Sequence, residues 1–270
     1  MKVIITGKNG FIGSHLAVRL EQEGYQVAGL PRQLLGQTEE LREFLTKEKP
    51  DYLYHLSSFG NMYHQTDEQE IFKANVVGTW NLLTASKDIP YKAFVNFSTS
   101  KHIQEQATFY GAGKAAGTYL ACAVAKNFNK PIVTIEPYSI YGPGEADFRF
   151  IPTVFRSCIK GDPMVLSPNA AHDWVYIEDF VVYLINIAQA VAIHEAFDVQ
   201  EFGSGKSVSN QYIVEVIEKI VGKKANIKEQ KTLRSFDTGS WHAEYSDTTT
   251  SLEEGLRKTY EYYKKKYEEG

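Results

Sequence analysis

A tyrosine and a lysine lie four residues apart in the segment FSTSKHIQEQATFYGAGKAAG, which runs from residue 97 to residue 117. On a helix, this spacing puts the side chains of Tyr110 and Lys114 on one face. The pKa of a free tyrosine is ~10, and a neighbouring ammonium lowers it by favouring the phenolate. Tyr110 would then be a usable general acid or base for a carbonyl/alcohol couple.

Small hydroxyl residues precede this pair at the end of a predicted strand, residues 93–98. Thr99 and Ser100 fall at the carboxyl edge of that strand, which is where open α/β sheets bind ligands. A hydroxyl there could hold the substrate oxygen, as small oxyanion-binding donors do. Thr99 is therefore the candidate partner of Tyr110 and Lys114. Ser100 is the neighbouring substrate contact, and the fallback if the register differs by one.

A glycine-rich loop, TGKNGFIGSH, connects the first predicted strand (Lys2–Thr6) to a predicted helix (11–23). Its glycines, Gly7, Gly10 and Gly13, recur at intervals of three residues. Glycine lets the chain turn sharply, and it lets a pyrophosphate reach the backbone amides at the start of the helix. In this position the pattern predicts a dinucleotide site, and a tight turn without a ligand is the alternative.

The second predicted strand (25–30) ends in GLPRQ, without the Asp or Glu that NAD-binding sites usually place there. Arg32 occupies this neighbourhood, and Lys8 lies in the glycine loop itself. Two cations without a carboxylate suit a 2′-phosphate, so we expect NADP(H) in preference to NAD(H). The alternative is that both are ordinary surface charges.

Short apolar runs alternate with amphipathic helical stretches over the first half of the chain. Nearly continuous apolar strands separated by helices predict a parallel sheet that is covered on both faces. The predicted strands are residues 2–6, 25–30, 51–56, 93–98 and 132–136. After YGPG, residues 141–144, the alternation breaks down, and we expect the chain to return to the sheet through DWVYIEDFVVYLINIAQ and AFDVQ.

The predicted fold class is therefore α/β, a Rossmann-type doubly wound parallel sheet with a small discontinuous substrate-binding lid. We expect residues 1–142 and 173–200 to form the NAD(P)-binding domain. The small lid would consist of residues 143–172 and 201–270.

The formal net charge of −4 gives no reason to expect binding to nucleic acid or to an anionic membrane. The two cysteines, Cys122 and Cys158, are widely spaced and have no His cluster nearby, so we expect neither a disulfide framework nor a metal site. The longest apolar run, residues 180–193, is too short and too polar to span a bilayer. Because the first residues lead straight into a strand, we expect no signal peptide and a cytoplasmic location.

Nearly the whole chain is covered by a series of motifs: TGKNGFIG, PDYLYHLSS, NVVGTWNLL, FSTS, YGAGK, YSIYGPG, HDWVYIEDF and SLEEGLRKTYEYY. In this order they resemble the extended short-chain dehydrogenase/reductases, the NAD-dependent epimerase/dehydratase family that modifies nucleotide sugars. The resemblance implies that Thr99, Tyr110 and Lys114 are the catalytic residues. Together with the glycine loop it implies these cofactor contacts: Gly7, Lys8, Gly10, Phe11, Ile12, Gly13, Arg32, Ser57, Asn75, Lys114 and Tyr138.

Departures from the family pattern narrow the chemistry that the resemblance implies. Sugar-nucleotide 4,6-dehydratases follow their catalytic Thr with Asp-Glu, but here Ser100 and Lys101 follow Thr99. Reductases that also epimerise C3 and C5 have a Cys near residue 100 and a His near Arg149, and neither is found here. The interval from Thr99 to Tyr110 (110 − 99 = 11) is shorter than in typical 4-epimerases and is similar to that in CDP-4-keto-6-deoxyhexose reductases.

We therefore expect an NADPH-dependent reductase of a 4-keto-6-deoxy nucleotide sugar. The runner-up is an NAD-dependent nucleotide-sugar 4-epimerase, which uses the same three residues without net redox. A non-catalytic cofactor-binding protein is a third alternative, because fold alone does not establish activity.

Candidate substrate contacts lie mostly in the second half of the chain. Ser139 replaces a frequent Asn of the family, and His172 stands where an Arg is common. Arg149 and Arg156 could meet the diphosphate of a nucleotide sugar, or they could face solvent. The helix that begins with YGAGK continues as AAGTYLACAVAKNF, which is apolar enough to pack in a homodimer or to be buried in a monomer. The nucleobase, the sugar and the stereochemistry at C4 stay open at this point.

Overall fold

The computed structural model describes residues 1–62, 64–100, 108–194, 197–230, 242–244, 246 and 248–268. Contacts divide the chain into two compact units. The first unit comprises Met1–Pro137 and Val181–Glu201, and the second comprises Tyr138–Phe180 and Phe202–Gly270. The boundaries that we predicted for the two domains, and the role of the second as a lid, stay predictions.

The first unit is built on a six-stranded sheet. In spatial order its strands are β2 (Gln26–Leu30), β1 (Lys2–Thr6), β3 (Tyr52–His55), β4 (Ala93–Phe97), β5 (Ile132–Pro137) and β9 (Asp198–Phe202). The four pairs from β2 to β5 are all parallel. Strand order reverses between β1 and β3, and ligands of open α/β sheets bind at the carboxyl ends of strands beside such a switch point. The predicted α/β fold with a Rossmann-type sheet is confirmed.

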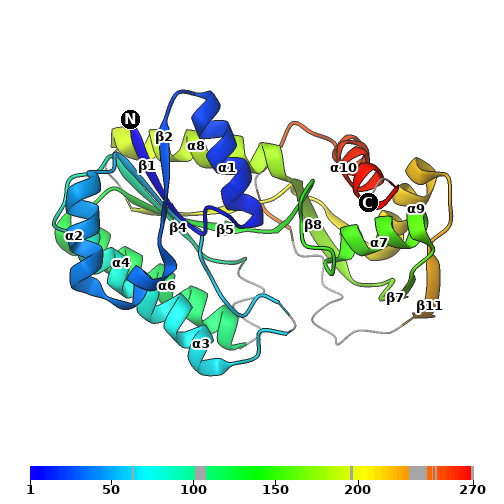
Figure 1. The fold of residues 1–270 in the computed structure, drawn as a ribbon, viewed down its shortest axis with the longest axis horizontal. Coiled ribbons are helices and arrows are strands. Elements are labelled where there is room, and N and C mark those ends of the chain that lie inside the picture. The colour runs from blue at the N-terminus through cyan, green and yellow to red at the C-terminus, as the bar shows by residue number, and fades with distance from the viewer. Residues whose placement is uncertain are drawn as a thin grey trace. The chain divides into compact units, whose positions relative to one another are not determined.

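Helices cover both faces of this sheet (Figure 1). One face carries α2 (Thr38–Glu48), α4 (Gly78–Ser86) and α6 (Phe109–Phe128), and the other carries α1 (Phe11–Gln22) and α8 (Ile177–His194). Apolar side chains of α2, α4 and α6 form a buried core with Ile4, Leu53, Phe94 and Ile132 of the strands. Burial on both faces explains why inner strands such as β1 and β4 are mainly apolar instead of alternating.

The helical stretch between β3 and β4 is interrupted. It consists of α3 (Glu68–Phe72), a π-helical turn (Lys73–Val77) and then α4. Short π-turns within α-helices occur frequently at functional sites. This turn contains Asn75, one of the predicted cofactor contacts, and a short 3₁₀ helix (Arg32–Gly36) after β2 contains another, Arg32.

The second unit contains a three-stranded sheet, a strand pair and three helices. The sheet consists of β10 (Ser207–Ser209), β8 (Ala171–Tyr176) and β6 (Ser139–Tyr141), and the pair of β11 (Asn226–Gln230) and β7 (Pro163–Leu166). The helices are α7 (Phe150–Lys160), α9 (Asn210–Val221) and α10 (Leu252–Glu268). Strand β8 pairs with β6 and β10 and not with the large sheet, which the chain rejoins only at β9.

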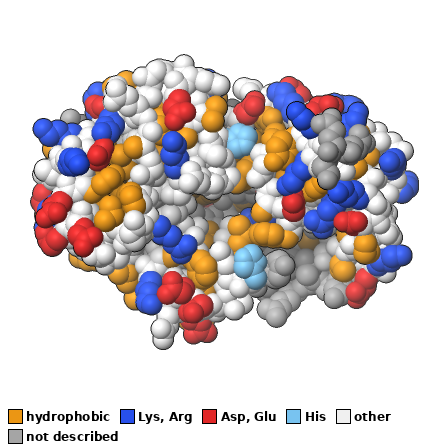
Figure 2. All heavy atoms as spheres, viewed as in Figure 1, with side chains coloured by type: hydrophobic (Ala, Val, Ile, Leu, Met, Phe, Trp, Pro, Cys, Tyr) orange, Lys and Arg blue, Asp and Glu red, His pale blue; other side chains and the backbone are white. Residues whose placement is uncertain are grey.

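Surface charge is mixed on both units. On the face drawn in Figure 2, Lys and Arg side chains are interspersed with Asp and Glu. Several charged side chains form ion pairs along one helix, such as Arg257 with Glu253 of α10. Within the described parts of the chain, no helix combines the length and the apolar character that crossing a membrane requires.

Candidate active site and cofactor cradle

The glycine loop forms a tight turn between β1 and α1. Gly7 has a φ of +71°, which a side chain would strain, and the Gly10 amide donates to the Gly7 carbonyl at 2.9 Å. Gly10 caps α1 without a side-chain hydrogen bond, and the first turn of α1 contains no acidic residue. The first amides of a helix have no acceptor within it, so the start of α1, including Phe11 and Ile12, fits an anionic group such as a pyrophosphate.

Gly13 lets α1 lie directly against this loop. A Cβ atom at Gly13 would lie 2.2 Å from the Gly7 carbonyl oxygen, a distance that no packed pair of atoms tolerates. Backbone cannot move aside as a flexible side chain could, so the third glycine of the motif is required for packing of the helix on the turn.

We expect Gly13→Ala to lower the free energy of unfolding by about 1–3 kcal/mol, because the new methyl group overpacks the turn. It should also weaken binding of a dinucleotide, if the loop forms the predicted site. Denaturant unfolding and calorimetric titration would measure the two effects. Gly36→Ala is the matched control, because the position of a Cβ at Gly36 meets nothing within 4 Å. Equal effects of the two substitutions would contradict this role of Gly13.

The carboxyl ends of the strands carry a row of buried polar side chains. Thr6 of β1 pairs in register with His55 of β3, and His55 pairs with Asn96 of β4. The Asn96 amide donates to Thr134 Oγ1 of β5 at 3.1 Å. All four residues are buried. Such a row is unusual inside an apolar sheet, and it marks the edge at which the candidate site lies.

Asn75 fixes the segment that follows β3. Its side chain accepts a hydrogen bond from the Phe59 amide at 3.0 Å and donates to the Phe59 carbonyl at 2.7 Å. The Ser57 amide, in the same segment, donates to Thr6 Oγ1 at 3.0 Å, and the Ser57 hydroxyl is buried without a partner among the described residues. Asn75 thus holds the segment that follows β3 in place, and the Ser57 hydroxyl could bond a ligand.

Helix α6 positions the predicted acid–base pair. It begins where the Thr108 side chain accepts a hydrogen bond from the Gly111 amide. Tyr110 is half-buried, whereas Lys114 is only 3% exposed. The Lys114 ammonium forms no hydrogen bond or ion pair with a described residue, and burial lowers the pKa of Lys114 to about 8. A buried ammonium in this state fits the hydroxyl groups of a ribose.

Hydrogen bonds connect the end of β4 to the turn of α6 that contains Lys114. Ser98 Oγ donates to the Lys114 carbonyl at 3.3 Å, and Thr118 Oγ1 donates to Ser98 Oγ at 2.9 Å. Thr99 and Ser100 follow directly and are both buried. The structure therefore brings the predicted hydroxyl segment and the Lys114 turn together within the first unit. The catalytic roles of Thr99, Tyr110 and Lys114 remain predictions.

The two predicted phosphate-binding cations lie near the end of β2. The aliphatic part of Lys8 packs over Gly29, and its ammonium lies 3.5 Å from the Glu21 carboxylate. The Arg32 guanidinium lies over the Phe59 ring, 5.9 Å from the centroid. Both cations thus contact neighbouring side chains, and no Asp or Glu directly follows β2 in the sequence.

Most predicted substrate contacts belong to the second unit. Arg149 precedes α7 and lies 3.6 Å from the Glu145 carboxylate, whose pKa burial raises to about 8. The His172 ring contacts the edge of Trp174, and Ser139 is opposite Trp174 in the register of β6 and β8. The Tyr138 hydroxyl, a predicted cofactor contact, donates to the His242 carbonyl at 3.1 Å.

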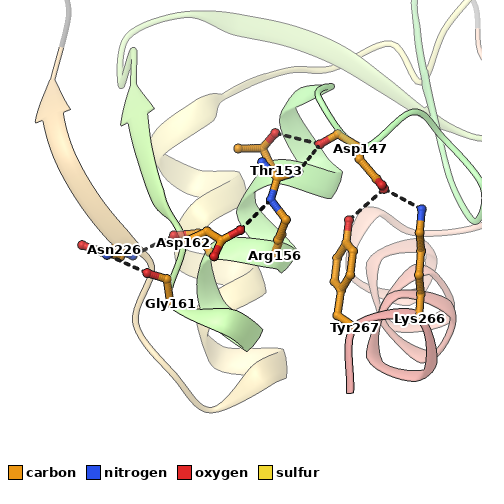
Figure 3. A network of polar contacts seen from close by, with 9 residues as sticks. Asp147, Thr153, Arg156, Gly161, Asp162, Asn226, Lys266 and Tyr267 are labelled. Atoms are coloured by element: carbon orange, nitrogen blue, oxygen red, sulfur yellow. Dashed lines mark hydrogen bonds and ion pairs between the residues drawn. The ribbon is translucent and has the colours of Figure 1, made fainter. Parts of the chain in front are cut away.

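Arg156 is engaged in a network inside the second unit (Figure 3). Its guanidinium lies 3.1 Å from the Asp162 carboxylate and donates to the Asp147 carbonyl at 3.1 Å. The Asp147 carboxylate in turn accepts from Lys266 and Tyr267 at the end of α10. These contacts join α7 to the segments before and after it. The predicted contact of Arg156 with a diphosphate stays a prediction.

The comparisons with known proteins agree with this geometry. The model of the NAD-dependent epimerase/dehydratase family matches residues 3–199 of this 270-residue chain. The chain belongs to this family. The resemblance to the extended short-chain dehydrogenase/reductases is thereby confirmed, and the glycine loop, the Thr99 segment and the Tyr110–Lys114 pair all lie within the matched region.

Relatives within the family include epimerases and dehydratases. The chain is 24% identical to the probable UDP-glucuronate 4-epimerase of Rhizobium meliloti, over 99% of this chain and 98% of the relative. It is 21% identical to dTDP-glucose 4,6-dehydratase 1 of Escherichia coli, over 97% and 92%. Among solved structures, UDP-glucuronic acid 4-epimerase of Bacillus cereus, in complex with UDP-glucuronic acid and NAD, is 25% identical with a TM-score of 0.83, over 99% and 100%.

Proposed function

We propose that the protein is an NAD-dependent nucleotide-sugar 4-epimerase. The observation that carries the proposal is Lys114, a buried ammonium one helical turn from Tyr110 at the carboxyl edge of the sheet. The 4-epimerases of Rhizobium meliloti and Bacillus cereus, matched over nearly their whole length, support epimerisation over the net reduction that the short interval between Thr99 and Tyr110 suggested.

The start of α1 and three residues of the first unit each have a defined role in this proposal. The start of α1 would bind the pyrophosphate of NAD, and Lys114 would bind the ribose next to the nicotinamide. Tyr110 would take the proton of the C4 hydroxyl and later return it, while the positive charge of Lys114 favours the phenolate. Thr99 would hold the C4 oxygen by a hydrogen bond. Bound NAD would supply the acceptor, and then the donor, of the C4 hydride.

The test is to incubate the purified protein with NAD and UDP-, dTDP-, CDP- and GDP-hexoses or hexuronic acids. Epimerisation predicts that C4 isomers interconvert, as seen by NMR, without accumulation of free reduced cofactor. Net consumption of reduced cofactor with a 4-keto sugar nucleotide, and no isomer interconversion, would overturn the proposal in favour of a reductase.

NADPH-dependent reduction of a 4-keto-6-deoxy nucleotide sugar is the second candidate. One observation favours it: β2 is followed by Pro31 and Arg32, with Lys8 over Gly29, and the sequence lacks the Asp or Glu that usually ends this strand and bonds the adenosine ribose.

If this candidate is correct, Lys8→Ala combined with Arg32→Ala should weaken NADPH binding by about 10-fold or more, because two charge-assisted contacts to the 2′-phosphate are lost. NADH binding should change little. Fluorescence titration with both cofactors would measure the ratio. Lys126→Ala, an exposed lysine of α6, serves as the control. A preference of the unmodified protein for NADH would count against this candidate.

The remaining features of the proposal concern the substrate side and assembly. The proposed substrate contacts are Ser100, Ser139, Arg149, Arg156 and His172, with the two arginines as candidate ligands of the diphosphate. A homodimer through α4 and α6 would cover Trp80 and Phe128, which are each 47% exposed. Cysteines that remain free in the structure fit a reducing, cytoplasmic compartment.

A further inference from the structure

A buried chain of hydrogen bonds crosses the first unit beside the candidate site, and the proposed chemistry does not use it. The Ser57 amide donates to Thr6 Oγ1 at 3.0 Å, and Thr6 Oγ1 lies 2.9 Å from His55 Nδ1. On the other side of the ring, His55 Nε2 lies 2.9 Å from Thr79 Oγ1, which donates to the Asn75 carbonyl at 2.8 Å. The side chains of the three central residues lie in the buried interior.

The donor and acceptor of each hydrogen bond in this series follow from the bond that Thr79 makes at one end. Thr79 Oγ1 has given its proton to the Asn75 carbonyl, so it can only accept from His55 Nε2. His55 Nδ1 is then the acceptor for the Thr6 hydroxyl, and the ring is a neutral imidazole with its proton on Nε2. Burial, and next the charge of Lys114, lower the pKa of His55 to about 3, in keeping with a neutral ring. His55 therefore joins two elements in one fixed tautomer.

One end of the chain supports the helix that carries the proposed acid–base pair. A Cβ at Gly113 of α6 would lie 3.2 Å from the Asn75 Cβ, and one at Gly117 would lie 3.5 Å from the Thr79 Cγ2. Helix α6 thus rests on the π-turn and the first turn of α4 through two glycines. At Gly113 the space is tighter than an ordinary contact, so a shift of Asn75 would be passed to α6 there, whereas the 3.5 Å at Gly117 is an ordinary van der Waals distance.

The other end supports the cofactor cradle. Thr6 is the last residue of β1 and directly precedes the glycine loop, while a Cβ at Gly7 would lie 3.1 Å from the Ser57 amide nitrogen. The loop and the segment after β3 are therefore packed together where Thr6 accepts the Ser57 amide. The hydrogen bond that Thr6 donates to His55 Nδ1 therefore supports the side of the site proposed to bind the dinucleotide.

We propose that His55 is a positioning residue that sets the distance between the cofactor cradle and the Tyr110–Lys114 pair. This inference rests on the proposed function, in which that pair acts on a sugar held beside the nicotinamide. A misplacement of about 1 Å between reacting groups costs on the order of 100-fold in rate. Loss of the bond from His55 to Thr79 should therefore lower kcat far more than it raises KM.

Thr79→Val tests this most cleanly, because it removes the hydroxyl and keeps the shape, and Thr79→Ser is the matched variant that keeps the hydroxyl. We expect Val to lower kcat by about 30–100-fold with KM changed by less than about 3-fold, and Ser to restore kcat to within about 3-fold of the unmodified protein. His55→Asn retains an acceptor for Thr6 and loses the donor to Thr79, so it should resemble Thr79→Val. If His55→Asn does not fold, the comparison of Thr79→Val with Thr79→Ser is a sufficient test of the inference.

Two measurements without sugar separate this inference from the proposed function. NMR of protein containing nitrogen-15-labelled histidine should show one ring protonated only on Nε2 and unchanged between pH ~5 and ~8, and Thr79→Val should disturb that signal. Hydrogen exchange of the α6 amides should be faster in Thr79→Val than in Thr79→Ser.

The inference is overturned if Thr79→Val leaves both kcat and α6 exchange unchanged, or if the His55 ring is protonated on Nδ1. An unmodified protein that turns over no nucleotide sugar, yet shows the expected tautomer and exchange difference, would refute the proposed function and leave the structural role of His55 intact.

Discussion

Tyr110→Phe should lower turnover by about 1000-fold while the protein still folds and binds NAD with nearly unchanged affinity. The substitution removes one oxygen atom, which is the group proposed to take and return the proton of the C4 hydroxyl. General acid–base catalysis contributes ~10²–10⁴-fold, so the loss should be of this order. Isomer interconversion followed by NMR measures the rate, and calorimetric titration measures NAD binding.

The control for this experiment is Tyr119→Phe on the same helix, because the Tyr119 side chain is 77% exposed. It should leave turnover unchanged. Full activity of Tyr110→Phe would remove the proposed mechanism without affecting the assignment to the family. If NAD binding is lost together with activity, the residue holds the cofactor and its acid–base role is unsupported.

Lys114→Met should stabilise the protein without cofactor by up to about 3 kcal/mol at neutral pH. The folded chain buries a charged ammonium there, and burial lowers the pKa of Lys114 from 10.5 to about 8. This difference of about 2.5 pKa units (10.5 − 8) corresponds to about 3 kcal/mol. Methionine has a similar length and no charge, so it fills the space without the desolvation cost. The same variant should be catalytically inactive.

The stability gained in Lys114→Met depends on pH with a defined sign. Between about pH 8 and pH 10.5 the unfolded chain binds the Lys114 proton and the folded chain does not. The unmodified protein therefore gains stability from this residue as the pH rises through that window, and the advantage of the variant shrinks. Denaturant unfolding at several pH values measures the difference. Lys126→Met, at an exposed position of α6, should show no such dependence.

An advantage of Lys114→Met that stays constant up to pH 10.5 would show that the ammonium is not destabilised by burial. A variant less stable than the unmodified protein at pH 7 would show that Lys114 has a favourable partner in the protein.

Much of the first unit can be predicted from the sequence because local signals and tertiary structure agree there. Strands such as β1 and β4 are apolar on both faces, and three glycines follow the first strand directly. Strand β8, in contrast, begins the segment that we expected to lead back to the large sheet, and it pairs with β6 and β10. It alternates partly exposed and buried side chains, with His172 and Trp174 on its more open face, a pattern typical of a small sheet covered on one side.

The features that sequence patterns did not reveal depend on contacts between distant residues. A single histidine in an apolar strand is usually a core residue, and only the register of β1 with β3 places Thr6 beside His55. The π-turn contains Asn75, whose side chain bonds the Phe59 backbone 16 residues earlier in the chain. No helical periodicity encodes this contact. The sequence signal that could have indicated the row of buried polar side chains is the presence of polar residues near the carboxyl ends of apolar strands.

The π-turn also governs the helical phase of everything that follows it. Successive residues of an α-helix are rotated by about 100°, so one extra residue in a turn rotates the rest of the helix by that angle. In α4 this rotation turns Leu82 and Leu83 into the core and Thr79 toward the His55 ring. Deletion of one residue from Lys73–Val77 would give a regular helix, and it would at the same time turn these side chains away. The length of this segment is thus as strictly determined as the identity of its residues.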